Sequence, residues 1–142
     1  MDRSPDVIPG MRYRDAYAAM DFLEQAFGFE RVLVVHAEGG LVAHAQLRFG
    51  TGMIMLGSER PGAEAADLAS PGSATPTMGV YCRTDDVDSL FARAQSVGAE
   101  VVRPLNDTDY GSRDCAFRDP EGQVWSFGDY RPSMEPQGNV GP

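Results

Sequence analysis

The sequence predicts an α+β protein made of two tandem βαβββ modules, and three observations support this fold class. Glycines recur seventy positions apart, since Gly28 in AFGFERV matches Gly98 in SVGAEVV and Gly52 in GTGMIML matches Gly122 in PEGQVWS. An amphipathic helical segment precedes the first glycine of each copy. β-prone runs separated by turn residues follow that glycine. Such an internal repeat indicates two copies of one structural unit.

The first module is predicted at about residues 7–58. A short apolar run at 7–13 predicts a strand, and Asp15 after it can accept the free amide hydrogens that open a helix. The predicted helix has an apolar stripe made of Ala16, Met20, Leu23 and Phe27. Gly28 stands where a left-handed residue usually ends a helix. Three further strands are predicted at 30–37, 41–49 and 53–56, with Glu-Gly-Gly-Leu and Gly-Thr-Gly as turns.

The second module, at about 77–130, repeats this order. A strand is predicted at 78–83, and Asp86 begins a helix whose apolar face is Val87, Leu90, Phe91, Ala94 and Val97. Gly98 ends this helix, which is one residue shorter than the first. Strands are then predicted at 100–104, 113–118 and 123–127, and Asp-Pro-Glu-Gly is a strong turn signal before the last one.

We expect one domain that spans residues 1–142, because a unit of roughly 50 residues is marginal on its own. The stretch at about 59–76 is rich in Ala, Ser, Gly and Pro and is interpreted as the connector between the modules. Residues 131–142 are interpreted as a loose tail.

Composition excludes several classes of function. A formal net charge of −9 argues against nucleic acid as a partner, since phosphate binding needs a basic surface. We expect no membrane association and a cytoplasmic protein, because no apolar run approaches spanning length and the first residues do not resemble a signal peptide. Cys82 and Cys115 lack a CxxC spacing and are expected to be small buried hydrophobes. Motifs of serine hydrolases, P-loop proteins and HExxH metalloproteases are absent from the sequence.

Taken together, the duplicated βαβββ pattern, the DPEGQVW turn and the FLEQAFGFE helix end resemble the vicinal oxygen chelate superfamily of glyoxalases, bleomycin-resistance proteins and extradiol dioxygenases. The resemblance covers about residues 7–130. It is strongest to the glyoxalase/bleomycin-resistance-like branch, in YRDAYAAMDFLEQAFGFE, HAQLRFG and YGSRDCAFRDPEGQVWSFG. It implies a cupped, eight-stranded mixed sheet and a homodimer, whose modules pair within a chain or are exchanged between chains.

The resemblance also implies where a metal ion would bind, because enzymes of the superfamily use His or Glu from the first and last strands of each module. The matching positions here are Ile8, Leu56 (or Met55, if the register slips by one), Gly79 and Ser126. Divalent transition metals need imidazole, carboxylate or thiolate donors, which these residues lack. We therefore expect neither a metal nor another cofactor. The alternative is one divalent metal ion at a different site, held by His44 and an acid such as Glu38.

The two histidines flank the Gly39-Gly40 turn. A two-residue hairpin loop would pair Val35 with His44 and direct the imidazoles of His36 and His44 to opposite faces of the sheet. An odd-length loop or a bulge would place both on one face. We interpret His36 as an exposed or edge-strand residue, whereas for His44 a pocket-lining role and a structural role remain equally open.

Strand alternation extends the candidate cavity. Tyr81 and Arg83 share the face of Gly79, and Val124 shares that of Ser126. The opposite face, which should pack under the helices, consists of Met78, Val80, Cys82, Trp125 and Phe127. Trp125 could stack on a cofactor, but a core position is favoured.

A polar loop that includes Tyr110 and Gly111 leads to Arg113 at the expected cavity rim. Arg113 could pair with a ligand carboxylate or phenolate, or form a salt bridge to Asp107, Asp109 or Asp114.

The favoured function is a metal-free protein that sequesters a mostly apolar or aromatic small molecule, as antibiotic-resistance members of the family do. The alternatives are a lyase, isomerase or dioxygenase with a non-standard site, and an interaction module. The candidate ligand-binding residues are Ile8, His44, Gln46, Leu56, Gly79, Tyr81, Tyr110, Arg113, Val124 and Ser126.

Overall fold

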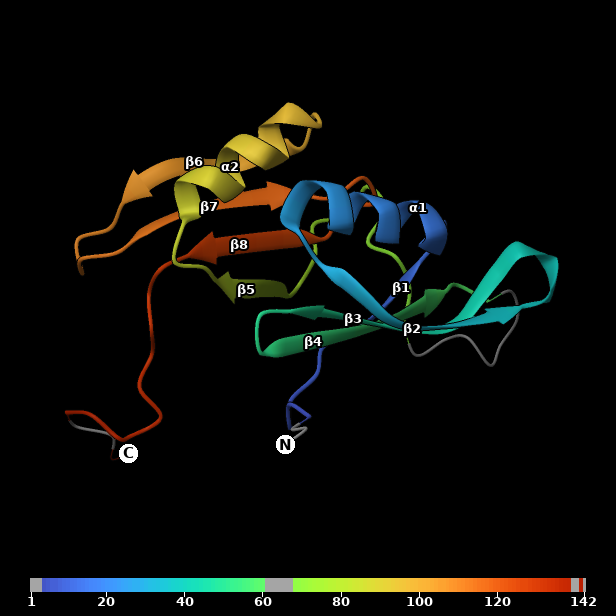
Figure 1. The fold of residues 1–142 in the computed structure, drawn as a ribbon, viewed down its shortest axis with the longest axis horizontal. Helices are drawn as coiled ribbons and strands as arrows, with labels where there is room; N and C mark the ends of the chain where they lie inside the picture. The colour runs from blue at the N-terminus through green and yellow to red at the C-terminus, as the bar shows by residue number, and fades with distance from the viewer. Residues whose placement is uncertain (1–3, 61–67, 139–140, 142) are drawn as a thin grey trace.

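The computed structural model describes residues 4–60, 68–138 and 141 and shows the βαβββ order twice (Figure 1). Part of the predicted connector, 61–67, and parts of the predicted tail lie outside the described residues. The first module contains β1 (Gly10–Tyr13), α1 (Ala16–Phe22), the π-helix η1 (Leu23–Phe27), β2 (Glu30–Ala37), the 3-10 turn η2 (Glu38–Gly40), β3 (Leu41–Phe49) and β4 (Gly52–Ser58). The second contains β5 (Gly79–Arg83), α2 (Val87–Ser96), β6 (Glu100–Asp107), β7 (Arg113–Arg118) and β8 (Val124–Gly128).

Each module folds into one four-stranded mixed sheet. The strand orders are β1-β4-β3-β2 and β5-β8-β7-β6, and in each sheet the first pair is parallel while the others are antiparallel. The α+β fold class and the duplicated module are therefore confirmed. The helices α1 and α2 lie next to each other, each over its own sheet (Figure 1). No helix in the described part of the chain has the length and apolar character needed to cross a membrane.

The first helix differs from its prediction as a single α-helix. The side chain of Asp15 accepts a hydrogen bond from the amide of Ala18 at 3.0 Å, and Gly28 ends the helix with φ of 83°, both as expected. Between them the last turn is a π-helix, Leu23–Phe27. A π-turn holds one residue more than an α-turn. The extra residue of the first module is thus accommodated inside the helix.

One hydrophobic core runs through both modules. The ring of Phe27, from the end of η1, lies 4.6 Å from the ring of Phe127 and 6.2 Å from that of Trp125, measured between centroids. Phe29 also contacts Trp125 edge to face. Trp125 is fully buried, so the core position is confirmed for this residue. Cys82 and Cys115 are buried free thiols, as predicted.

A buried carboxylate connects the second module to the first. Asp119 Oδ2 accepts hydrogen bonds from the hydroxyl of Tyr13 at 2.6 Å and from the indole N–H of Trp125 at 3.0 Å. Its Oδ1 accepts from the amides of Glu121 and Gln123, which fixes the Asp-Pro-Glu-Gly turn. Burial, followed by the charge of Asp119, holds the pKa of Tyr13 well above its usual value. Tyr13 therefore remains a neutral donor.

Three predictions of side-chain position are wrong. Ile8 lies just before β1 instead of within it. Leu56 faces the core with 3% of its surface exposed, so the alternative register, with Met55 on the open face, is the one adopted. Met78 is 68% exposed and does not pack under the helices, because β5 begins one residue later, at Gly79.

Candidate ligand-binding site

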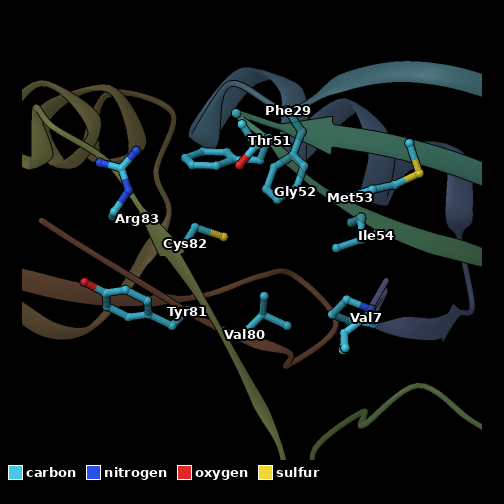
Figure 2. A pocket seen from close by; sticks show the side chains of 13 residues that line it. Val7, Phe29, Thr51, Gly52, Met53, Ile54, Val80, Tyr81, Cys82 and Arg83 are labelled. Atoms are coloured by element: carbon cyan, nitrogen blue, oxygen red, sulfur yellow. The ribbon is translucent and has the colours of Figure 1, made fainter. Parts of the chain in front are cut away.

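A crevice of about 360 Å³ lies between the two modules (Figure 2). It is bordered by the turn between β3 and β4, by the segment before β1, and by β5. Its apolar lining includes Pro9, Phe29, Phe49, Ile54, Val80 and Cys82. Polar groups come from Thr51, Tyr81 and Arg83. A concave apolar site with a few polar groups at its edge is the usual form of a small-molecule pocket.

Cys82 lines this crevice but is not suited to act as a nucleophile. Its side chain is 7% exposed, and burial raises the pKa of the thiol to about 12. At neutral pH the sulfur is therefore protonated, and a protonated thiol is a poor nucleophile and metal ligand. Its chemical role in the crevice is that of a small hydrophobe.

The open face of the first sheet, opposite α1, connects to the crevice through Met53. His44 Nε2 lies 3.0 Å from Oε1 of Gln46, and the amide nitrogen of Gln46 lies 3.9 Å from the sulfur of Met53. Because an amide oxygen only accepts, this contact assigns the proton to Nε2 of His44. Met53 itself lines the crevice. The structure thus brings two candidate residues, His44 and Gln46, together on one face.

The imidazoles of His36 and His44 lie on opposite faces, although the expected two-residue loop is wrong. The loop is the three-residue turn η2, and a bulge between Val35 and His36 compensates for its odd length. Val35 pairs with His44 as predicted, but His36 pairs with the buried Val42. His36 then reaches α1, where its Nδ1 is hydrogen bonded to the hydroxyl of Tyr17. It is an exposed residue of the edge strand β2, as interpreted from the sequence.

The open face of the second sheet carries four of the candidate residues. β5 and β8 pair Gly79 with Val124 and Tyr81 with Ser126, so these side chains share one face. Tyr81 borders the crevice, and its hydroxyl accepts a hydrogen bond from the amide of Tyr130 at 3.1 Å. Partial burial raises the pKa of Tyr81, which keeps the phenol neutral.

Tyr110, at the predicted rim, contacts Tyr130, which in turn is hydrogen bonded to Tyr81. The rings of Tyr110 and Tyr130 meet edge to face at 5.4 Å. Tyr110 is 62% exposed, so this aromatic group stands at the surface beside the second sheet.

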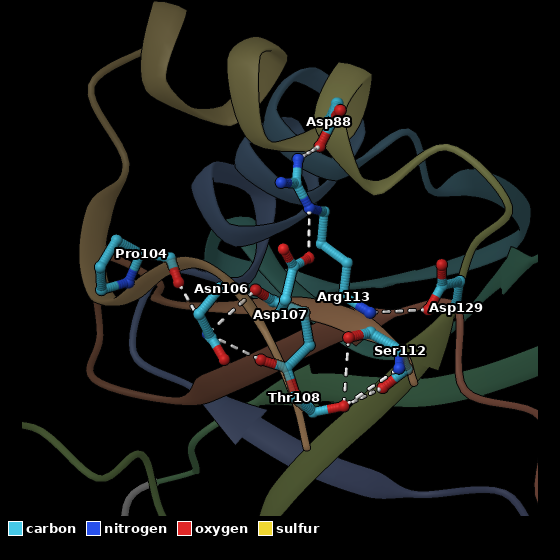
Figure 3. Close-up of polar contacts among 9 residues, drawn as sticks. Asp88, Pro104, Asn106, Asp107, Thr108, Ser112, Arg113 and Asp129 are labelled. Atoms are coloured by element: carbon cyan, nitrogen blue, oxygen red, sulfur yellow. Dashed lines mark hydrogen bonds and ion pairs between the residues drawn. The ribbon is translucent and has the colours of Figure 1, made fainter. Parts of the chain in front are cut away.

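Arg113 is held by acids of the protein itself (Figure 3). Its Nε lies 2.9 Å from Asp107 and its Nη1 2.8 Å from Asp88. The Arg113 hydrogen bond is the main cause that lowers the pKa of Asp107. Of the two interpretations of Arg113, the salt bridge is the one that the structure contains. The partner Asp88 was not predicted, because it belongs to α2.

The four positions that correspond to metal ligands in the family do not fit a metal centre. Ile8, Met55, Gly79 and Ser126 offer neither imidazole, carboxylate nor thiolate. Within 4–60, 68–138 and 141, no three His, Cys, Asp or Glu side chains are grouped so that they could hold an ion. Asp114 lies on the same face as Ser126, and its carboxylate is already hydrogen bonded to Asn106 and Arg103.

Some lining residues were not predicted from the sequence. Pro9, Phe49 and Ile54 face the crevice because the two modules meet there. Their positions depend on packing between modules, for which strand alternation within one module gives no signal. The Gly-Thr-Gly turn was predicted only as a turn, yet its Thr51 lies at the edge of the crevice.

Two βαβββ modules that share a core and enclose an apolar crevice define a protein of the vicinal oxygen chelate type. A family model, the Glyoxalase/Bleomycin resistance protein/Dioxygenase superfamily, matches residues 9–127. The chain belongs to this superfamily.

Relatives and solved structures agree with this assignment. An uncharacterized protein of Mycobacterium tuberculosis is 33% identical over 126 residues, which cover 87% of this chain and 74% of the relative. The crystal structure of TioX from Micromonospora sp. ML1 is similar with a TM-score of 0.71 and 31% identity, covering 88% of this chain and 98% of TioX. A superfamily member from Sphaerobacter thermophilus DSM 20745, with a TM-score of 0.67, 20% identity and coverage of 87% and 97%, shows the fold alone.

Proposed function

We propose that this protein binds a planar, mostly apolar small molecule in the crevice between its modules and does so without a metal ion. The observation that carries the proposal is the crevice itself: about 360 Å³ in volume, walled by aromatic and aliphatic side chains. The positions equivalent to the family's metal ligands lack suitable donors, which favours binding over metal-dependent catalysis.

The groups around the crevice suit an aromatic ligand. Aromatic rings bind planar molecules through offset or edge-to-face contacts, and Phe29 and Phe49 provide such rings inside the crevice. Met53 adds a flexible, polarizable side chain that adapts to the shape of a ligand. Sequestration of an antibiotic-like aromatic molecule is the function that these features support best.

We further propose that the protein is a homodimer. Leu33 and Val35 on the edge strand β2 are 43% and 44% exposed, and Val35 pairs with His44 on the open face. Apolar side chains on an unpaired sheet edge favour association with a second chain. A second copy at this edge would shield the open face of the first sheet from water.

A thermal-shift screen with a variant that fills the crevice tests the binding proposal. Aromatic antibiotics and metabolites are added to the wild-type protein, and a true ligand should raise the Tm by about 5–10 °C at roughly a hundred times its Kd. Thr51→Trp places an indole at the edge of the crevice and should abolish the shift, whereas Thr51→Ser should retain it. A ligand that shifts Thr51→Trp as much as the wild type binds elsewhere, and no shift from a broad panel would contradict the proposal.

A further inference from the structure

We propose that Arg12 forms an anion-recognition site, beside His44, that selects planar ligands carrying a carboxylate or phenolate. This inference rests on the proposed function and specifies its ligand class. Arg12 lies in β1 and pairs with Gly57 of β4, on the same open face of the first sheet as His44. Neither Arg12 nor Gly57 was singled out by the sequence, because a single arginine in a strand carries no motif.

The Arg12 guanidinium lacks an acid partner in the part of the chain that the structure describes. Carboxylates lie within 4 Å of eight other arginines, namely Arg14, Arg31, Arg48, Arg83, Arg103, Arg113, Arg118 and Arg131. Arg12 Nη1 makes a long hydrogen bond of 3.5 Å to the carbonyl oxygen of Ser58. Arg12 is half-buried, and an anion in the groove would provide a counter-charge that residues 4–60, 68–138 and 141 do not supply.

Gly57 creates the space in which this guanidinium lies. A Cβ atom at Gly57 would be 2.7 Å from Nη1 of Arg12 and 3.1 Å from the carbonyl oxygen of Ala43 on β3. Any other residue at this position would therefore displace the guanidinium. With glycine there, the Arg12 side chain extends across β4 toward β3, the strand that carries His44.

Arg12 and His44 line the same groove, about 140 Å³ in volume, together with Met55 and Leu68. The bond from Nε2–H of His44 to Gln46 orients the imidazole and leaves Nδ1 as an acceptor for a hydroxyl or N–H group of the ligand, while Arg12 supplies the donors to its anion. The groove therefore combines a planar cation, a polar ring and apolar contacts. A planar guanidinium forms paired hydrogen bonds with a carboxylate, which makes an aromatic acid a better fit than a neutral aromatic.

A third cavity of about 280 Å³ lies between the groove and the crevice. This cavity shares Leu68 with the groove and shares Pro9 and Val80 with the crevice. An extended ligand could thus place its acid at Arg12 and its apolar body toward the crevice. The overall charge of −9 repels anions, so selection of an acid requires a local cation such as this one.

The test compares two probes of nearly the same shape, the anionic 2-naphthoate and the neutral 2-naphthamide, by isothermal titration calorimetry at low salt. The wild type should bind the acid at least about tenfold more tightly than the amide, because a charge-assisted hydrogen bond supports a difference of this size. Arg12→Gln and Gly57→Ala should each remove this preference while the Kd for the amide stays within about twofold. Arg48→Gln is the matched control, since it removes one positive charge from β3 where the guanidinium is already paired with Glu30. It should preserve the preference.

The outcomes separate the two proposals. If the wild type binds acid and amide equally, or if Arg12→Gln weakens both alike, the anion site is overturned while the binding function stands. If neither probe binds and the wider aromatic panel gives no ligand, the binding function fails and the anion site fails with it. A preference for the acid that Arg48→Gln abolishes as completely as Arg12→Gln would show a general charge effect and would also overturn the site.

Discussion

At the scale of single residues, Asp119 joins the two modules, a role that its turn motif did not indicate. It was predicted only as part of a turn, because Asp-Pro-Glu-Gly is a local signal. In the structure one carboxylate oxygen accepts from Tyr13 in the first module and Trp125 in the second, and the other accepts two backbone amides. Removal of a buried acceptor leaves its donors without partners, which costs more than the net value of the bonds themselves.

Asp119→Ala should therefore lower the free energy of unfolding by about 3 kcal/mol, since it leaves the Tyr13 hydroxyl and the Trp125 N–H buried without an acceptor. Tyr13→Phe removes one donor only and should lower it by about 1 kcal/mol. Urea denaturation followed by fluorescence measures both. An Asp119→Ala protein as stable as Tyr13→Phe would refute this role for the carboxylate.

The buried Cys82 predicts a change of stability at alkaline pH. The pKa of its thiol is raised by burial from an ordinary 9.0 to about 12 in the folded protein. The contribution of this thiol to the free energy of unfolding is therefore fully present below pH 9. It is lost as the pH rises from 9 toward 12, with a limiting slope of about 1.4 kcal/mol per pH unit. Cys82→Ala should show a shallower loss of unfolding free energy over pH 9–10.5. Parallel curves for the two proteins would contradict the prediction.

Residue positions were predictable where strand alternation alone decides them. Val80, Cys82, Trp125 and Phe127 face the core as alternation required. Leu56 does not follow the prediction because its face depends on how β4 pairs with β1 and β3, and a shift of one residue exchanges the two faces.

At the scale of elements, α2 of the second module stabilises the π-helical turn η1, which ends the first helix. The guanidinium of Arg93, on α2, donates to the backbone carbonyls of Gln25 and Glu24, both at 2.8 Å. Carbonyl groups near a helix end need such external donors. The π-turn and its partner arginine thus form one inter-module contact.

Arg93→Met should lower the free energy of unfolding by about 1–2 kcal/mol, because it removes two charge-assisted hydrogen bonds and preserves most of the aliphatic stem. Arg60→Met serves as a control, since Arg60 is exposed and has no carboxylate partner in the described part of the chain. Thermal and urea denaturation would report the difference. Equal stability of the two variants would show that the η1 carbonyls do not need Arg93.

Element boundaries illustrate what the sequence could and could not provide. The strands at 30–37, 41–49 and 113–118 match the prediction because turn residues limit both of their ends. β6 continues to Asp107 although Pro104 predicted its end. β6 is an edge strand, and a proline can be tolerated there because the missing N–H can face solvent. The register shift between Val35 and His36 likewise depends on how β2 pairs with β3 and has no local signal.

At the scale of the whole molecule, the second module also helps to begin the first helix. The carboxylate of Glu121 accepts hydrogen bonds from the amides of Arg14 at 2.6 Å and Asp15 at 2.8 Å, where the chain enters α1. Together with Asp119, these bonds fix the relative position of the modules and therefore the width of the crevice between them. The repeat was readable from the sequence, but this contact was not, because it joins residues more than a hundred positions apart.

The proposed homodimer is a prediction at this scale. Val35→Glu should convert a dimer to a monomer in sedimentation velocity, because it places a charge on the exposed apolar edge of β2. Val97→Glu changes a valine of similar exposure, 43%, at the end of α2 and should leave the dimer intact. A wild-type protein that sediments as a monomer at micromolar concentration would contradict the proposal.

The central claim, that the crevice binds an aromatic molecule without a metal ion, is tested most directly by calorimetric titration with and without EDTA. The tag-free protein is titrated with the aromatic molecule that raises its Tm most. The predicted result is saturable binding of one ligand per chain with the same Kd in both buffers. Binding that disappears in EDTA and returns when one equivalent of zinc, nickel, manganese or iron is added would contradict the claim.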